Sequence, residues 1–145
     1  MIVRDATADD HTCVMELLRH LNSDDTAPDT HASFNVFNSI LASPHFIVLV
    51  IEHEWQVAGT CYLNIIPNLT RGLSPYAVIE NVVTLPQFRK LGLGKRLMQS
   101  AIGRAFDEGC YKVMLLTGRG DGVQAFYKQC GMDAESKQAF IARRS

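Results

Sequence analysis

Hydrophobic and polar positions in the first half of the chain follow two different periods. Apolar residues recur at helical spacing in 14–21 and again in 34–41, so the pattern predicts two amino-terminal helices. The polar stretch 22–29 between them predicts a loop. The β-branched runs 46–51 and 57–66 are too short for helices, and together they predict an antiparallel hairpin.

The second half of the chain predicts a further alternation of strands and helices. The other expected elements are a first strand at 2–4, a strand at 76–85, a helix that begins at Leu93 and is capped by Gly109, a strand at 111–116, a helix at 123–129 and a last strand that includes 139–141. The predicted order is β-α-α-β-β-β-α-β-α-β, which is typical of a mixed α/β layer. We expect a single domain over 1–145.

Composition and charge exclude several classes of protein. Of the 145 residues, 47% are apolar and 20% are charged, and the net charge is -1, so nothing in bulk charge attracts nucleic acid or an anionic membrane. No apolar run reaches the roughly 18–20 residues of a spanning helix, and the amino terminus has no signal-peptide core. These features predict a cytoplasmic protein without nucleic-acid or membrane partners.

Cysteine and histidine positions give no sign of a metal site. The four cysteines lie tens of residues apart without CxxC spacing, and the five histidines are scattered. We therefore expect four buried free thiols and no metal.

A basic, glycine-containing turn between a strand and a helix is the strongest chemical signal. It comprises Arg89-Lys90-Leu91-Gly92-Leu93-Gly94, with Lys95 directly after it. The first amides of a helix lack partners and carry a partial positive charge, so such a turn can bind phosphate. It matches neither the GxxxxGK[ST] loop nor the GxGxxG fingerprint with its later acidic residue. Taken alone, it remains compatible with an ordinary turn whose basic residues are solvated.

Three segments in this order resemble the GNAT superfamily of N-acetyltransferases. The turn resembles the R/Q-x-x-G-x-G/A signature, 80–86 resembles the family's fourth strand, and 109–113 and 125–132 resemble the fifth strand and the FYEKxGF element. The resemblance implies the GNAT fold, a mixed and mostly antiparallel sheet of about six to seven strands flanked by about four helices. It also implies acetyl-CoA as co-substrate, held where the fourth and fifth strands splay apart.

The resemblance implies roles for particular residues. The coenzyme-binding set comprises Val82, Val83, Thr84, Arg89, Lys90, Leu91, Gly92, Leu93, Gly94, Lys95, Asp121 and Phe126. Main-chain groups of Val82 and Thr84 would pair with the pantetheine arm, 91–95 would hold the pyrophosphate, and Val82 or Val83 would donate to the oxyanion. Asp121 is the nearest substitute for an Asn that many relatives carry there.

Acetyl transfer to an amine also needs a base and a proton donor for the leaving thiolate. By resemblance Tyr127 is the general acid; the alternative is a core aromatic residue beside Phe126. Glu80 is the candidate base, directly or through water, because a carboxylate buried there would be costly without a task. The alternative is an exposed or ion-paired strand residue.

The acceptor is the least determined part of the prediction. Segments 80–83 and 109–112 resemble glucosamine-6-phosphate N-acetyltransferases, except that Asn81 replaces an acidic residue, so we expect direct transfer in a ternary complex to a primary amine of an amino sugar or similar small molecule. Arg71 could receive an anionic group, and acidic residues of 22–29 a cationic one. Open alternatives are a protein or peptide amine, an idle acyl-CoA-binding regulatory module and a phosphate-binding interaction domain. The resemblance also suggests a homodimer.

Overall fold

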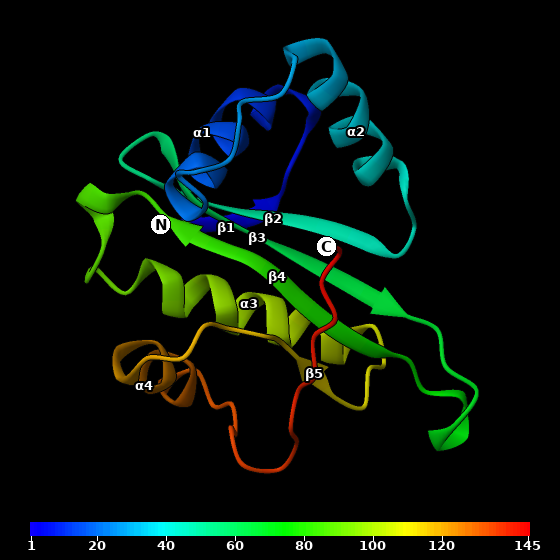
Figure 1. Cartoon of the computed structure of the whole chain (residues 1–145). Coiled ribbons are helices and arrows are strands. Elements are labelled where there is room, and N and C mark those ends of the chain that lie inside the picture. Colours follow the sequence, from blue (N-terminus) through cyan, green and yellow to red (C-terminus); the bar gives the residue numbers. More distant parts are fainter.

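The computed structural model describes residues 1–145 as four α-helices around one five-stranded sheet (Figure 1). The strands are β1 (Ile2–Asp5), β2 (Phe46–His53), β3 (Gln56–Ile66), β4 (Tyr76–Thr84) and β5 (Val113–Met114). The helices are α1 (His11–Leu21), α2 (Thr30–Ala42), α3 (Leu93–Asp107) and α4 (Asp121–Gln129). The mixed α/β class predicted from the sequence is confirmed.

The strands lie in the sheet in the order in which they occur along the chain. Strands β1 to β4 are antiparallel, whereas β5 runs parallel to β4. The β2–β3 hairpin closes at His53, which pairs with Gln56. Glu54 and Trp55 between them both have positive φ, which suits a tight turn that follows the twist of the strands. The predicted hairpin is therefore confirmed.

Two layers of helices cover the sheet (Figure 1). Helices α1 and α2 lie on one face, and α3 and α4 lie on the other. The larger core contains the buried side of α3, formed by Leu93, Leu97, Met98, Ala101 and Ala105. A smaller core lies beneath α1 and α2 and contains Val14, Phe37, Val48 and Val50. Because both faces of the sheet are covered, the sites open to ligands are restricted to its edges and to gaps between helices.

A charged cluster joins the first strand to the start of α1. The Arg4 guanidinium donates to Asp10 Oδ2 and to Glu52 Oε1, both at 2.7 Å. The main-chain amide of Thr7 donates to the same Asp10 oxygen at 2.7 Å. Arg4, more than any other neighbour, holds the pKa of the Asp10 carboxyl below its ordinary value, and Thr7 acts in the same direction. The cluster fixes the entry angle of α1 against β1 and β2.

Three sequence predictions are wrong. The last strand at 139–141 does not form: Phe140 and Ile141 are exposed, and the sheet has five strands instead of six or seven. The strand expected at 111–116 is reduced to Val113–Met114, where its only partner is β4. A strand needs a neighbour for its amides and carbonyls, and short apolar runs do not show where that neighbour lies. Cys13 is exposed, unlike the other three thiols.

Candidate active site

The β4 strand has an edge without a strand partner. Its ladder with β5 contains two pairs, Ala77 with Val113 and Val78 with Met114, after which the chain leaves β4 toward α4. We call residues 80–84 the free β4 edge. Main-chain amides and carbonyls that face this side have no strand to bind, so the edge can accept an extended ligand as an added strand.

A bulge in β4 decides which residues face the open side. Between the pairs Thr60 with Val83 and Tyr62 with Glu80, β4 contains one more residue than β3, and Asn81 has a φ of 53°. Asparagine tolerates this left-handed conformation better than most residues. A bulge reverses the alternation of a strand, so its main-chain groups change sides there.

The α3 amino terminus begins directly after the basic turn. Gly92 is its N-cap with a φ of 81°, a left-handed conformation that favours glycine, and no side chain caps the helix. The amides of Leu93, Gly94 and Lys95 in the first turn therefore remain available to an anion. Arg89, Lys90 and Lys95 are exposed around them and add positive charge.

Packing around Gly94 brings the free β4 edge, α3 and α4 together. A Cβ atom placed on Gly94 would lie 3.2 Å from the Phe126 ring of α4 and 3.8 Å from the Thr84 methyl group of β4. Since a contact of 3.2 Å is tighter than ordinary van der Waals contact, glycine allows the α3 amino terminus to approach both neighbours. Elements that are 42 residues apart in sequence, at 84 and 126, thus meet at one place.

The Tyr127 phenol lies half-buried beside this junction. Its ring packs edge-to-face on Phe126, with the centroids 5.0 Å apart. Burial raises the pKa of Tyr127, and the charges of Cys130, Cys61 and Glu80 raise it further. The phenol therefore keeps its proton at neutral pH and can donate it or a hydrogen bond.

Glu80 lies at the start of the free β4 edge with an exposed side chain. It pairs with Tyr62 of β3, and residues directly opposite each other in an antiparallel pair share a face of the sheet. Glu80 is a minor cause of the raised pKa of Tyr127, after burial. Because Glu80 is exposed, the cost of burying a carboxylate gives no argument for a catalytic role. The position of Glu80 at the start of the free β4 edge is the remaining support for that role.

The family model described as "Acetyltransferase (GNAT) family" matches residues 14–132. The chain belongs to this GNAT family. This membership agrees with the sequence resemblance, and the five strands and four helices are consistent with the fold of its GNAT neighbours. Solved structures of the same fold include complexes with CoA and with acetyl-CoA.

Several GNAT relatives resemble the chain in sequence or structure. A protein from Agrobacterium tumefaciens str. C58 that is assigned to the acetyltransferases is 41% identical with a TM-score of 0.95, covering 99% of this chain and 100% of that one. The glucosamine-6-phosphate N-acetyltransferase structure from Arabidopsis thaliana is 27% identical with a TM-score of 0.84, covering 97% of each chain. The glucosamine 6-phosphate N-acetyltransferase of Trypanosoma brucei brucei is 35% identical over 83 residues, which are 57% of this chain and 55% of that protein. The chain thus spans little more than half the length of this curated relative.

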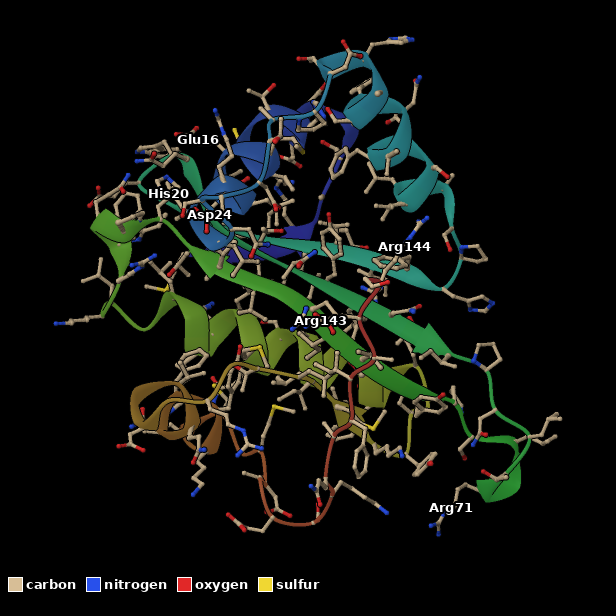
Figure 2. The ribbon with its side chains drawn as sticks, viewed as in Figure 1. Glu16, His20, Asp24, Arg71, Arg143 and Arg144 are labelled. Carbon is tan, nitrogen blue, oxygen red and sulfur yellow. The ribbon has the colours of Figure 1, made fainter.

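The fold gathers most of the predicted GNAT site residues and separates a few. Val83 is buried and its carbonyl oxygen faces β3, 2.9 Å from a Cβ atom placed on Gly59. It therefore does not face the open side, unlike its neighbours. Asp121 is the exposed first residue of α4, where a carboxylate also favours the helix dipole. Arg71 projects from the tip of the β3–β4 loop, far along the sheet from the α3 amino terminus, and its guanidinium lies 5.6 Å from the Tyr111 ring (Figure 2).

Two residues of the site were missed by sequence reasoning. Arg96 lines a surface hollow of about 550 Å³ together with Gly92 and Lys95, although its place on the polar face of α3 suggested only solvation. Arg96 lies four residues after Gly92, and this spacing places it on the same face of the helix as the basic turn. The sequence pattern places Tyr62 only within a strand; in the structure, burial raises the pKa of its phenol and the Asn81 side chain partly offsets this rise.

The structure gives two further findings about possible partners. No group of three or more potential metal-ligating side chains comes together in the chain. None of the helices has both the length and the apolar character needed to cross a membrane.

Proposed function

We propose that the chain transfers an acetyl group from acetyl-CoA to a primary amine of a small molecule, by direct transfer in a ternary complex. The observation that carries this proposal is the junction at Gly94, where an uncapped helix terminus meets the free β4 edge. The first suits a pyrophosphate and the second an extended pantetheine arm. Both belong to a chain of the GNAT family.

The alternation of β4 supports Val82 and Thr84 as the pantetheine-binding residues. The amide of Ala77 donates to Lys112 O next to β5, whereas the amide of Leu85 donates to Ala58 O of β3. With the bulge at Asn81 between them, the even-numbered residues 82 and 84 face the side that β5 leaves open. We infer that the Val82 amide donates to the carbonyl oxygen as it gains charge, and that Val83 has no part in it.

Glu80 and Tyr127 are suited to the two proton transfers. When bound, acetyl-CoA supplies the thioester carbonyl carbon that the amine attacks. Glu80 takes one proton from the ammonium form of the amine, directly or through water, so that the nitrogen lone pair can form the new C–N bond, and the nitrogen then loses a second proton to water. Tyr127 gives a proton, or a hydrogen bond, to the sulfur as the C–S bond breaks. Arg89, Lys90 and Lys95 are placed to hold the phosphates.

Calorimetry and a thiol-release assay test this function in two steps. Acetyl-CoA and CoA should bind with similar affinity, and ATP more weakly, because ATP has no pantetheine arm for the free β4 edge. An amine panel should then give thiol release that depends on the amine. Equal binding of ATP would favour a phosphate-binding interaction domain, and binding without turnover would favour a regulatory module.

The relatives direct the choice of the first acceptor. Two of them are named glucosamine-6-phosphate N-acetyltransferases, which supports an amino sugar as one member of the panel. A peptide with a free amine tests the protein-acetylation alternative. A homodimer, a location in the cytoplasm and a single domain over 1–145 stay predictions.

A further inference from the structure

A hollow of about 290 Å³ lies between α1 and α2, over the face of β3 opposite α3. We call it the α1–α2 hollow. Its lining includes Val14, Met15, Ala32, Val36, Ile40 and Tyr62. Its volume is close to the lower end of the range for small-molecule pockets, and none of its lining residues is charged.

The α1–α2 hollow has few polar groups, and the Ser33 hydroxyl among them already makes hydrogen bonds within the protein. The Ser33 hydroxyl donates to Thr30 O at 3.0 Å and lies 2.9 Å from His11 Nε2, so its hydrogen bonds are made within the protein. Tyr62 is the other polar side chain of the lining. A phosphate or a sugar with several hydroxyl groups would lose water there without gaining enough partners.

Tyr62 links the α1–α2 hollow to the candidate active site through its pairing with Glu80. It lines the hollow, pairs directly with Glu80 across β3 and β4, and its phenol interacts with the Asn81 side chain at the bulge. Glu80 and Tyr62 share one face of the sheet. A ligand in the hollow thus has its nearest site carboxylate at the start of the free β4 edge.

A carboxylate on the β4 side of the α1–α2 hollow favours a cation over an anion there. It belongs to Glu80, which pairs with the lining residue Tyr62. At the mouth, Val36 is 60% exposed, which leaves an apolar surface in water until a ligand covers it.

We propose that the acceptor is a small primary amine with an apolar body, which fills the α1–α2 hollow while its ammonium group lies near Glu80. This inference rests on the proposed function and narrows it, because it disfavours phosphorylated amino sugars as acceptors. Phenylethylamine has the required chemistry: one ammonium group, a short tether and an apolar ring. Glucosamine 6-phosphate is the matched opposite, with the same reacting group on a polar, anionic body.

The test compares these two amines on the full chain and on two variants. Val36→Asp puts a charge at the mouth of the α1–α2 hollow, and Asn35→Asp puts the same charge on the neighbouring exposed residue of α2 outside the lining. Phenylethylamine should have the higher kcat/KM by about tenfold or more, and Val36→Asp should raise its KM by a similar factor. Asn35→Asp should change neither value by more than about twofold. Acetyl-CoA affinity should be the same in all three proteins.

Calorimetry of phenylethylamine with the CoA-saturated protein gives a readout that does not need turnover. Its Kd should weaken by about tenfold in Val36→Asp and stay unchanged in Asn35→Asp. If phenylethylamine neither binds nor reacts while glucosamine 6-phosphate does, or if Val36→Asp has no effect, this inference is wrong and the proposed function stands. If acetyl-CoA does not bind, or binds without any amine reacting or binding, both are wrong.

Discussion

The two halves of the candidate site are built in different ways. The donor half comprises the free β4 edge, the α3 amino terminus and Tyr127, and in the proposed function it binds acetyl-CoA mainly through main-chain groups. The acceptor half comprises α1, α2 and the α1–α2 hollow, and it offers side chains only. Main-chain recognition requires particular backbone conformations, such as the positive φ at Gly92, and glycines at such positions leave a signature in the sequence. Side-chain recognition needs only apolar residues at helical spacing, which any core also requires.

The largest expected effect is on the proton transfer in the donor half. Tyr127→Phe should lower kcat by about 100-fold or more, because it removes the proton donor and leaves the ring and its packing on Phe126 in place. Acetyl-CoA affinity should not change. Tyr111→Phe is the matched control, since Tyr111 is an exposed tyrosine at the far end of the sheet. Steady-state thiol release measures both variants, and an undiminished kcat in Tyr127→Phe would remove this residue from the mechanism.

The strand, turn and helix that carry the donor half were predictable because they follow one another within a short segment. The turn from Arg89 to Gly94 joins a strand to a helix within a few residues, so charge, glycine positions and helix start could be read together. The bulge at Asn81 was not predicted, since a bulge appears only when β3 and β4 are paired. The pairing of β3 with β4 also decides that Val83 faces β3 and that Val82 faces the open side.

The acceptor half and the ends of the sheet could not be predicted in the same way. The α1–α2 hollow depends on how two helices diverge over β3, and the same apolar pattern would also suit a closed core. The contact of Arg4 with Glu52 joins residues that are 48 positions apart in sequence. The segment 139–141 contains an apolar run, but no strand of the sheet pairs with it.

A smaller loss of acetyl-CoA affinity should distinguish binding by the α3 amino terminus from attraction by net charge. Gly94→Asp places a carboxylate among the free amides of α3 and a side chain against Phe126, so it should weaken acetyl-CoA binding by about 30-fold, or ~2 kcal/mol. Gly103→Asp puts the same charge in the middle of the same helix, where a side chain meets nothing within 4 Å. Calorimetry with acetyl-CoA compares the two. Equal losses would mean that net charge, and not the helix terminus, governs binding.

The free energy of unfolding should depend on pH in acid because of the contact between Arg4 and Asp10 at the start of α1. Because the pKa of Asp10 is lowered in the folded state, its stabilisation is complete above the ordinary value of 3.8 and is lost as the pH falls through the folded value. Asp10→Asn should therefore cost about 1–3 kcal/mol at pH 7 and progressively less below pH ~4. Urea unfolding at several pH values measures this, with the exposed Asp9→Asn as control. A pH-independent difference would show that packing, and not the charge, is responsible.

The smallest effect is expected at the carboxyl end. Residues 135–145 are exposed throughout, so their removal should change the free energy of unfolding by less than about 0.5 kcal/mol. Thermal unfolding of the truncated chain measures this. A large fall in Tm would mean that the segment packs on a second copy of the chain, as the predicted homodimer would allow.

Amide hydrogen exchange with and without acetyl-CoA tests the donor half most directly. It reports the main-chain groups themselves, whereas turnover depends on both halves of the site. Binding should slow exchange at Val82 and Thr84 on the free β4 edge and at 93–95 in the first turn of α3, and should leave Val83 unchanged. Protection confined to other segments, or none at these amides at a saturating concentration of acetyl-CoA, would contradict the account.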